Sequence, residues 1–179
     1  MKELRGVVEA VACDSTHRFS KPRREVIHLV AGRGIEGDAH AGPHVRHRFL
    51  ARRNPGSPNL RQVHLIPAEL FDDLASFGYQ ISSGDLGENV TTRGLQLERL
   101  PLGALLRLGS SAVVELTGLR KPCVLLDRFQ AGLKKQLIGK GPLYKCGVMG
   151  IVRAGGPLRA DDKVCVFLPE RNHAPLPPL

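Results

Sequence analysis

The sequence predicts an α+β domain in which β-strands dominate and close, fully or partly, into a barrel with a few short helices. Three observations lead to this fold class. Glycine (20 residues) and proline (13 residues) are frequent among the 179 residues, which favours many turns and short elements. The apolar runs are short and often alternate with polar residues, as in half-buried strands. Strands and helices do not alternate regularly, which disfavours a parallel α/β sheet.

The expected strands follow from this alternation and from runs of β-branched residues. They cover residues 4–11, 25–30, 62–66, 105–108, 112–117, 146–152 and 163–167. Gly109, Ser110 and Ser111 join two of these strands, and so short a connection predicts a β-hairpin.

Two short helices are expected between the strands. Pro67 begins the first helix and Gly78 ends it, in keeping with the preference of proline for the first turn and of glycine for the end. Residues 129–138 are expected to form the second helix. Residues 14–24 are polar and basic, and residues 82–92 are rich in turn formers, so we expect loops in both places.

We expect a single domain over residues 1–168. No repeat of 20–50 residues and no heptad pattern is visible, which disfavours solenoids and coiled coils. Residues 169–179 contain four prolines, and we expect this tail to be extended and disordered.

The chain carries 26 lysine and arginine residues against 17 aspartate and glutamate residues, a net charge of +9. Such an excess favours an anionic partner. One function that it allows is a basic, non-catalytic module that binds anions or nucleic acid. The aromatic content of only 4% and the absence of a recognised nucleic-acid motif argue against nucleic acid as the partner.

The sequence also bears on location. No apolar stretch is long enough to span a membrane, so we expect no membrane partner. Residues 1–20 contain several charges and no apolar core, so we expect no secretory signal and a cytoplasmic location. The four cysteines include no C-x-x-C pair and are expected to be free thiols in a reducing compartment.

Cys123 carries the strongest chemical signal among these cysteines. It ends the segment Gly-Leu-Arg-Lys-Pro-Cys, in which Arg120 and Lys121 come shortly before it. Nearby cations favour the thiolate, which is the form that ligates soft metals or attacks sulfur. The alternative, that Cys123 is a buried structural thiol, stays open at this point.

A glycine-rich loop over residues 32–42 is the second candidate site. Gly37 and Gly42 would let the backbone approach a ligand closely. Asp38 can orient His40 or a ligand amine. The loop matches neither a P-loop nor a dinucleotide-binding fingerprint, so an ordinary glycine turn is the alternative.

Three histidines, His40, His44 and His47, would share one face if this region were helical, and could then bind zinc. Pro43 argues against such a helix, and no glutamate completes a metalloprotease motif. Arginines interleave with the histidines at positions 46, 48, 52 and 53, which favours an anion-binding patch or a solvated loop.

Residues 84–94 form a further dense polar stretch. Its donors and acceptors are Glu88, Asn89, Thr91 and Thr92. Arg93 can bind a phosphate or a carboxylate through two parallel hydrogen bonds. The alternative is the polar rim of a hairpin.

Taken together, three motifs resemble the MOSC domain family, which is named after the C-terminal domain of molybdenum cofactor sulfurases. The motifs are Gly34–Gly42, Gly84–Gly94 and Gly118–Cys123. The resemblance extends to about Leu168 and is closest to the small stand-alone bacterial members. It implies a strand-rich, barrel-like MOSC fold over residues 1–168.

The resemblance further implies that the chain binds the molybdenum cofactor, molybdopterin. Cys123 occupies the position of a cysteine that ligates molybdenum or carries sulfur in the family. Arg93, Arg120 and Lys121 would bind the pterin phosphate, and the two polar loops would bind the pterin. The role of the arginine-rich residues 44–61 is not implied by the resemblance.

Two activities are compatible with this resemblance. One is a molybdenum-dependent oxidoreductase that receives electrons from a partner. The other is a sulfur carrier or sulfurtransferase, in which a separate cysteine desulfurase would load Cys123, because the chain contains no pyridoxal-phosphate-dependent domain.

Overall fold

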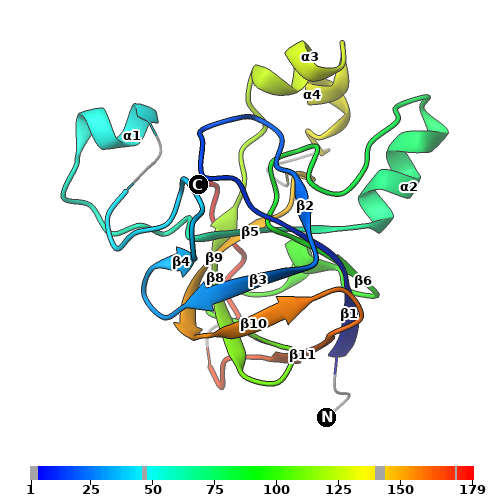
Figure 1. The fold of residues 1–179 in the computed structure, drawn as a ribbon. Helices are drawn as coiled ribbons and strands as arrows, with labels where there is room; N and C mark the ends of the chain where they lie inside the picture. The colour runs from blue at the N-terminus through cyan, green and yellow to red at the C-terminus, as the bar shows by residue number, and fades with distance from the viewer. Residues whose placement is uncertain (1–3, 46–47, 140–143, 172) are drawn as a thin grey trace.

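In the computed structural model, residues 4–45, 48–139, 144–171 and 173–179 are described. The strands of the main sheet are β1 (Leu4–Ala12), β2 (Arg23–Arg24), β5 (Val63–Pro67), β6 (Val90–Arg93), β7 (Leu105–Leu108), β8 (Ala112–Leu119), β9 (Val148–Ala154) and β11 (Lys163–Phe167). Their order is β11-β7-β8-β9-β5-β6-β1-β2, and β1 also pairs with β11. Seven strands therefore close into a barrel, which confirms the predicted fold class (Figure 1).

Neighbouring barrel strands are antiparallel except β5 and β6, which are parallel. The inward positions are filled by aliphatic side chains, among them Val8, Leu65, Leu106 and Leu116, all of them fully buried. With no tryptophan in the chain, branched aliphatic residues supply the volume that fills the barrel.

A smaller antiparallel sheet lies against the barrel. It consists of β3 (Val26–Val30), β4 (Gly34–Ile35) and β10 (Gly156–Arg159), in the order β10-β3-β4. Figure 1 shows β3 and β10 in front of the barrel strands. The strand expected at 25–30 is confirmed as β3, whereas β4 and β10 were not expected because they are short and contain glycine.

The helices are short: α1 (Arg48–Arg53), α2 (Glu69–Ser76), the 3₁₀ turn η1 (Leu97–Arg99), α3 (Leu125–Phe129) and α4 (Leu133–Gln136). Figure 1 shows α1, α3 and α4 at the end of the barrel opposite the N-terminus. A second apolar cluster, which includes Leu74, Leu126 and Leu137, packs α2, α3 and α4 together. None of the helices in the described ranges is long and apolar enough to cross a membrane.

Two expectations about these elements were wrong. Residues 90–93 form β6 in the barrel wall rather than a turn-rich loop, because β-branched threonines suit a strand even where their hydroxyls make the segment look polar. Residues 129–138 do not form one helix. Gly132 adopts a left-handed conformation with φ 80°, which separates α3 from α4.

The proline-rich tail is extended, as expected, but the expected disorder is wrong for residues 173–179. The backbone N–H of Leu119 donates to Pro177 over 2.8 Å, and the N–H of Leu179 donates to Leu119 over 2.8 Å. Leu176 is buried in the barrel core. Prolines lack an N–H group but still accept hydrogen bonds, so the tail can lie beside the end of β8.

Candidate functional site

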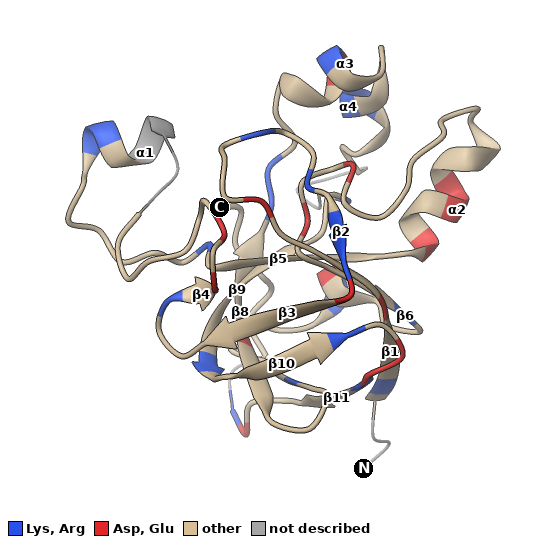
Figure 2. Ribbon diagram, in the orientation of Figure 1, with Lys and Arg blue, Asp and Glu red and all other residues tan. Residues whose placement is uncertain are grey.

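A basic pocket opens at the end of the barrel that carries α1 and α3. Its cationic side chains are Arg18, Lys21, Arg61, Arg120 and Lys121. Cys123, His40, His64 and Asn89 line it as well, and its described lining contains no aspartate or glutamate. Basic segments gather at this end of the barrel (Figure 2). Two of these cations are paired, Lys21 with Asp38 and Arg18 with Asp14, but neither carboxylate is part of the lining. Such a cluster of cations attracts an anion.

A buried ion pair joins two walls of this pocket. Nζ of Lys21 lies 2.8 Å from Oδ2 of Asp38, and the side chains are 4% and 1% exposed. Nδ2 of Asn89 donates to the same Asp38 oxygen over 3.0 Å. Burial raises the pKa of Asp38, but hydrogen bonds from His40 and the charge of Lys21 outweigh it, so this pKa lies well below its ordinary value.

Asp38 also orients His40 towards the pocket. Its Oδ1 accepts the backbone N–H of His40 over 2.9 Å and lies 3.3 Å from ring Nδ1. The His40 ring lies 5.2 Å from the ring of His17, measured between centroids. The glycine-rich loop therefore places the imidazole of His40 at the pocket, whereas the carboxylate of Asp38 bonds to other residues of the protein.

Arg120 is held by a sulfur atom and by an aromatic ring. Its Nη1 donates to Sγ of Cys146 over 2.8 Å, and its guanidinium lies 5.9 Å from the ring centroid of Phe19. The backbone N–H of Arg120 donates to the carbonyl of Gly147 over 3.0 Å. Burial raises the pKa of the Cys146 thiol, although Arg120 opposes this shift. These contacts fix the guanidinium in the pocket.

Two further basic groups lie near Arg120. Burial lowers the pKa of Arg61, and the positive charge of Arg120 lowers it further. His64 is completely buried, and burial together with Arg120 holds its pKa well below its ordinary value. His64 is therefore neutral at pH 7. Its Nε2 lies 2.9 Å from the carbonyl oxygen of Cys146, to which a neutral imidazole donates.

Cys123 lies between the basic pocket and a larger neighbouring one. Its thiol is half-buried. The second pocket has a volume of about 630 Å³ and shares Arg61, Lys121 and Cys123 with the first. Cys123 thus borders two cavities and does not belong to an apolar cluster, unlike Cys146. Among the cysteines it is the one placed to meet a ligand.

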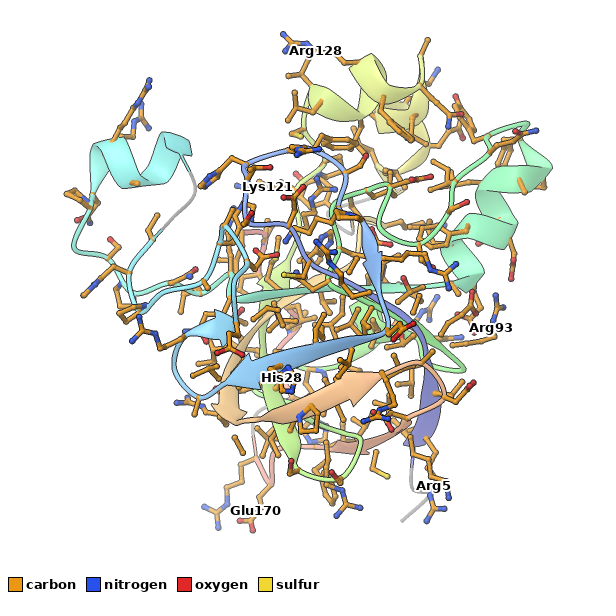
Figure 3. The ribbon with its side chains drawn as sticks, viewed as in Figure 1. Arg5, His28, Arg93, Lys121, Arg128 and Glu170 are labelled. Atoms are coloured by element: carbon orange, nitrogen blue, oxygen red, sulfur yellow. The ribbon has the colours of Figure 1, made fainter. Side chains whose placement is uncertain are left out.

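Arg93 lies apart from the basic pocket, contrary to the role that the resemblance implied. Its guanidinium pairs with Glu9 and with Asp72, the latter over 2.8 Å. Figure 3 shows it on the flank of the barrel, away from Lys121. The hydrogen bonds that Arg93 donates to Asp72 and Glu9 raise the pKa of its guanidinium. The Arg93 guanidinium is thus neutralised by two carboxylates and does not line the basic pocket, so the predicted role as a phosphate ligand there is wrong.

Among the other predicted residues of the second polar motif, Asn89 lines the pocket and three belong to the framework. Leu86 and Gly87 of this motif line the pocket as well. Thr91 and Thr92 are buried in β6, and Glu88 is fully buried beside them. Oε1 of Glu88 accepts hydrogen bonds from the backbone N–H of Gly84 and from the Thr91 hydroxyl. Burial raises the pKa of Glu88. These three residues hold a loop and a strand and do not line the pocket.

The two glycines of the first motif that were predicted to contact a ligand, Gly37 and Gly42, do not line the basic pocket either. Gly37 borders a separate shallow pocket, together with Arg33 and Glu36. The carbonyl of Gly42 accepts a hydrogen bond from Nδ2 of Asn59 over 3.0 Å. Their backbone groups shape the loop that carries His40 instead of contacting a ligand there.

Of the three histidines predicted as zinc ligands, His40 lines the basic pocket and His44 does not. His44 is exposed and pairs with Pro58 in an isolated β-bridge. His47 lies outside the described residues. No group of three or more His, Cys, Asp or Glu side chains suited to a metal ion occurs in the described part of the chain.

Four pocket residues were missed by sequence reasoning: Arg18, Lys21, Arg61 and His64. Arg18 and Lys21 lie in what reads as an ordinary basic loop before β2. The available signal was Lys21 directly before Pro22, since proline holds the preceding residue in an extended conformation. His64 lies within a strand pattern, where a buried histidine looks like a core residue.

Solved structures of low sequence identity share this fold. The YuaD protein from Bacillus subtilis superposes with a TM-score of 0.79 at 22% identity, covering 94% of this chain and 99% of that one. YiiM from Escherichia coli gives 0.64 at 20% identity, covering 94% and 73%. YiiM from Geobacillus stearothermophilus gives 0.65 at 18% identity, covering 94% and 77%.

No functionally curated protein matches the chain. The family model of the MOSC domain, however, matches residues 37–165, which is most of the chain. This match begins in the glycine-rich loop, ends within β11 and includes Cys123. The chain belongs to the MOSC domain family.

Proposed function

We propose that this MOSC protein binds the molybdenum cofactor in the basic pocket, with the thiolate of Cys123 as a ligand of the metal. The observation that carries the proposal is the half-buried Cys123 at the edge of a pocket lined by cations and free of described carboxylates. A dithiolene-bound metal needs a soft sulfur ligand, and a phosphate needs several cations.

The donor set fits this cofactor. Lys121 and the fixed guanidinium of Arg120 would hold the phosphate. Arg18 pairs with Asp14 over 3.4 Å and adds positive charge to the lining. Asn89 and His40 offer polar groups to the edge of a pterin. Lys21 is already committed to Asp38, so it contributes charge to the pocket more than a free donor.

The bound cofactor would supply the redox or sulfur chemistry of the metal. The chain's own residues would do three things. Arg120 and Arg61 concentrate positive charge beside the ligand, and neutral His64 adds no further charge at pH 7. Leu86, Leu125 and Met149 form apolar parts of the wall that exclude water. Cys123 presents sulfur to whatever lies in the pocket.

The experiment is to produce the protein in cells grown with molybdate and to measure molybdenum and released pterin per chain. We expect both to be bound by the unaltered protein. Arg120→Gln should lower the pterin content severalfold, whereas Arg93→Gln, which removes an arginine outside the pocket, should leave it unchanged. Folded protein without metal or pterin, in repeated preparations, would overturn the proposal.

A second candidate is that Cys123 carries sulfur delivered by a cysteine desulfurase. It is favoured by the position of Cys123, which also borders the larger second pocket. Persulfidation would add 32 Da to Cys123 after incubation with a desulfurase and cysteine, about the mass of one sulfur atom. An electron-transfer partner would instead be required by the oxidoreductase alternative, and in that case the persulfide should not accumulate.

A further inference from the structure

We propose that the second pocket is a binding site for small organic anions with an apolar body, such as aromatic carboxylates. Cys123 is part of its lining, and most of its other lining residues come from the arginine-rich segment 44–61, whose role the sequence left unexplained. As a substrate site for the chemistry above, it rests on the proposed function. As a binding site, it stands on the geometry alone.

The walls of this pocket are apolar, with cations at the shared edge. Val45, Pro58, Leu60, Pro122 and Leu179 supply the apolar surface. Arg61 and Lys121 lie at the boundary with the basic pocket, and Arg53 is a further cation of the lining, away from that boundary. The lining contains no described aspartate or glutamate. An apolar body would cover the walls while a carboxylate meets the two cations at the boundary, which is the pattern of few polar groups in an apolar pocket.

The base of the arginine-rich segment is firmly tied to the barrel. The backbone N–H of Val45 donates to the carbonyl oxygen of Ser57 over 3.0 Å. This bond brings the two ends of the segment together, and α1 lies between them in the sequence. Nδ2 of Asn59 donates to the carbonyl oxygens of His40 (2.9 Å) and Gly42. The Thr117 hydroxyl donates to the carbonyl of Leu60 over 2.6 Å.

These hydrogen bonds hold Asn59 and Leu60, which line the pocket, in place relative to the barrel. Asn59 connects the pocket to the loop that carries His40, and Thr117 connects it to β8, the strand that leads to Cys123. Leu60 is therefore held next to the site although its side chain is 42% exposed. Leu60 thereby forms part of a continuous apolar lining with Pro58 and Pro122, which suits a ligand with an apolar body.

The test is protection of Cys123 from alkylation. The probe is 2-naphthoate, and its neutral counterpart is 2-naphthol. Alkylation by iodoacetamide is followed at each cysteine by mass spectrometry. At a concentration roughly ten times its dissociation constant, 2-naphthoate should slow alkylation of Cys123 about tenfold. Cys13, which is also half-buried but lies elsewhere, should react at an unchanged rate.

Matched variants locate the binding site. Leu60→Glu places a negative charge in the wall and should abolish the protection. Leu102→Glu is the control, because Leu102 is similarly exposed (40%) and lies outside this pocket. Equal protection by 2-naphthol, no protection by 2-naphthoate, or protection that survives Leu60→Glu would each overturn the inference.

The two proposals fail separately. If 2-naphthoate protects Cys123 but the protein holds no molybdenum, the binding site stands and the cofactor proposal falls. If molybdenum is bound but no probe protects Cys123, the cofactor proposal stands and the second pocket is not an anion site.

Discussion

Nζ of Lys21 lies 2.8 Å from Oδ2 of Asp38, and both side chains are almost completely buried. The pair connects the loop before β2 with the glycine-rich loop after β4. Asn89 adds a third connection, to the segment before β6. Three loops that are distant in the sequence are thereby held together beside the basic pocket.

Removing the cation of this pair should destabilise the fold. Lys21→Met leaves the Asp38 carboxylate buried without its partner, so we expect the free energy of unfolding in urea to fall by about 3–5 kcal/mol. The double variant Lys21→Met/Asp38→Asn no longer buries an unpaired charge and should be more stable than Lys21→Met. A loss below about 1 kcal/mol for Lys21→Met would contradict the buried pair.

His64 should make stability depend on pH. Its pKa is lowered in the folded state, so the unfolded chain binds a proton below about pH 6.5 that the folded chain does not. Stability should therefore fall as the pH decreases below about 6.5, by up to about 1.4 kcal/mol per pH unit from this group. Urea unfolding from pH 7.5 to 5 measures the slope.

His64→Gln should reduce this slope, whereas His28→Gln, at an exposed position of β3, should keep it (Figure 3). A slope that is the same in all three proteins would show that His64 is not buried in its neutral form.

The Asp38 carboxylate should contribute at lower pH. Because its pKa is lowered, the contribution is present above about pH 4 and is lost as the pH falls further. Asp38→Asn should flatten the loss of stability below about pH 4, measured by urea midpoints. The control is Asp73→Asn, at an exposed position of α2. Identical acid dependence in both variants would count against the strong pairing of Asp38.

The contact between Arg120 and Cys146 should affect anion affinity. Cys146→Ala removes the sulfur that accepts a hydrogen bond from Nη1, so we expect binding of pyrophosphate to weaken by about three- to tenfold. Cys165→Ala is matched, because Cys165 is also buried and accepts from an arginine, Arg107, but lies outside the pocket. Isothermal titration calorimetry measures both affinities. Equal affinities would show that Cys146 does not position Arg120.

Gly147 permits a close approach of two strands next to Arg120. A Cβ at Gly147 would lie 2.2 Å from the carbonyl oxygen of Leu65, and φ is 80°. Gly103 has nearly the same φ, 81°, with nothing within 4 Å of its Cβ position. Gly103→Ala should cost about 1–2 kcal/mol, and Gly147→Ala at least about 2 kcal/mol more. Chemical unfolding of both variants measures this, and equal costs would contradict the close approach.

The barrel could be predicted because, in several strands, the order of apolar and polar residues indicates which side chains are buried. In β3 and β7 the polar residues His28 and Arg107 are exposed and lie between buried apolar neighbours, as the alternation predicts. β6 was missed because the residues that it buries include Thr91 and Thr92, whose hydroxyls resemble those of a surface loop. Their burial follows from strand pairing, which no local pattern reveals.

The candidate site was predicted only in part, for a similar reason. Cys123, Arg120 and His40 carry visible chemistry and do line the pocket. Arg93 also looks like an anion-binding residue in the sequence. Its guanidinium instead forms ion pairs with Glu9 and Asp72, which are distant in the sequence and could not be recognised as its partners. Lys21 and His64 were hidden in a loop and a strand, and only the closed barrel brings them to the pocket.

The molybdenum content of a Cys123→Ser variant tests the account most directly. Cys13→Ser is the matched control, since Cys13 is likewise half-buried but lies outside the basic pocket. All three proteins are purified from cells grown with molybdate, checked for equal thermal stability, and analysed for metal by mass spectrometry. We expect the unaltered protein and Cys13→Ser to hold equal amounts of molybdenum and Cys123→Ser to lose it. Full retention by Cys123→Ser would contradict the proposed role of this thiol.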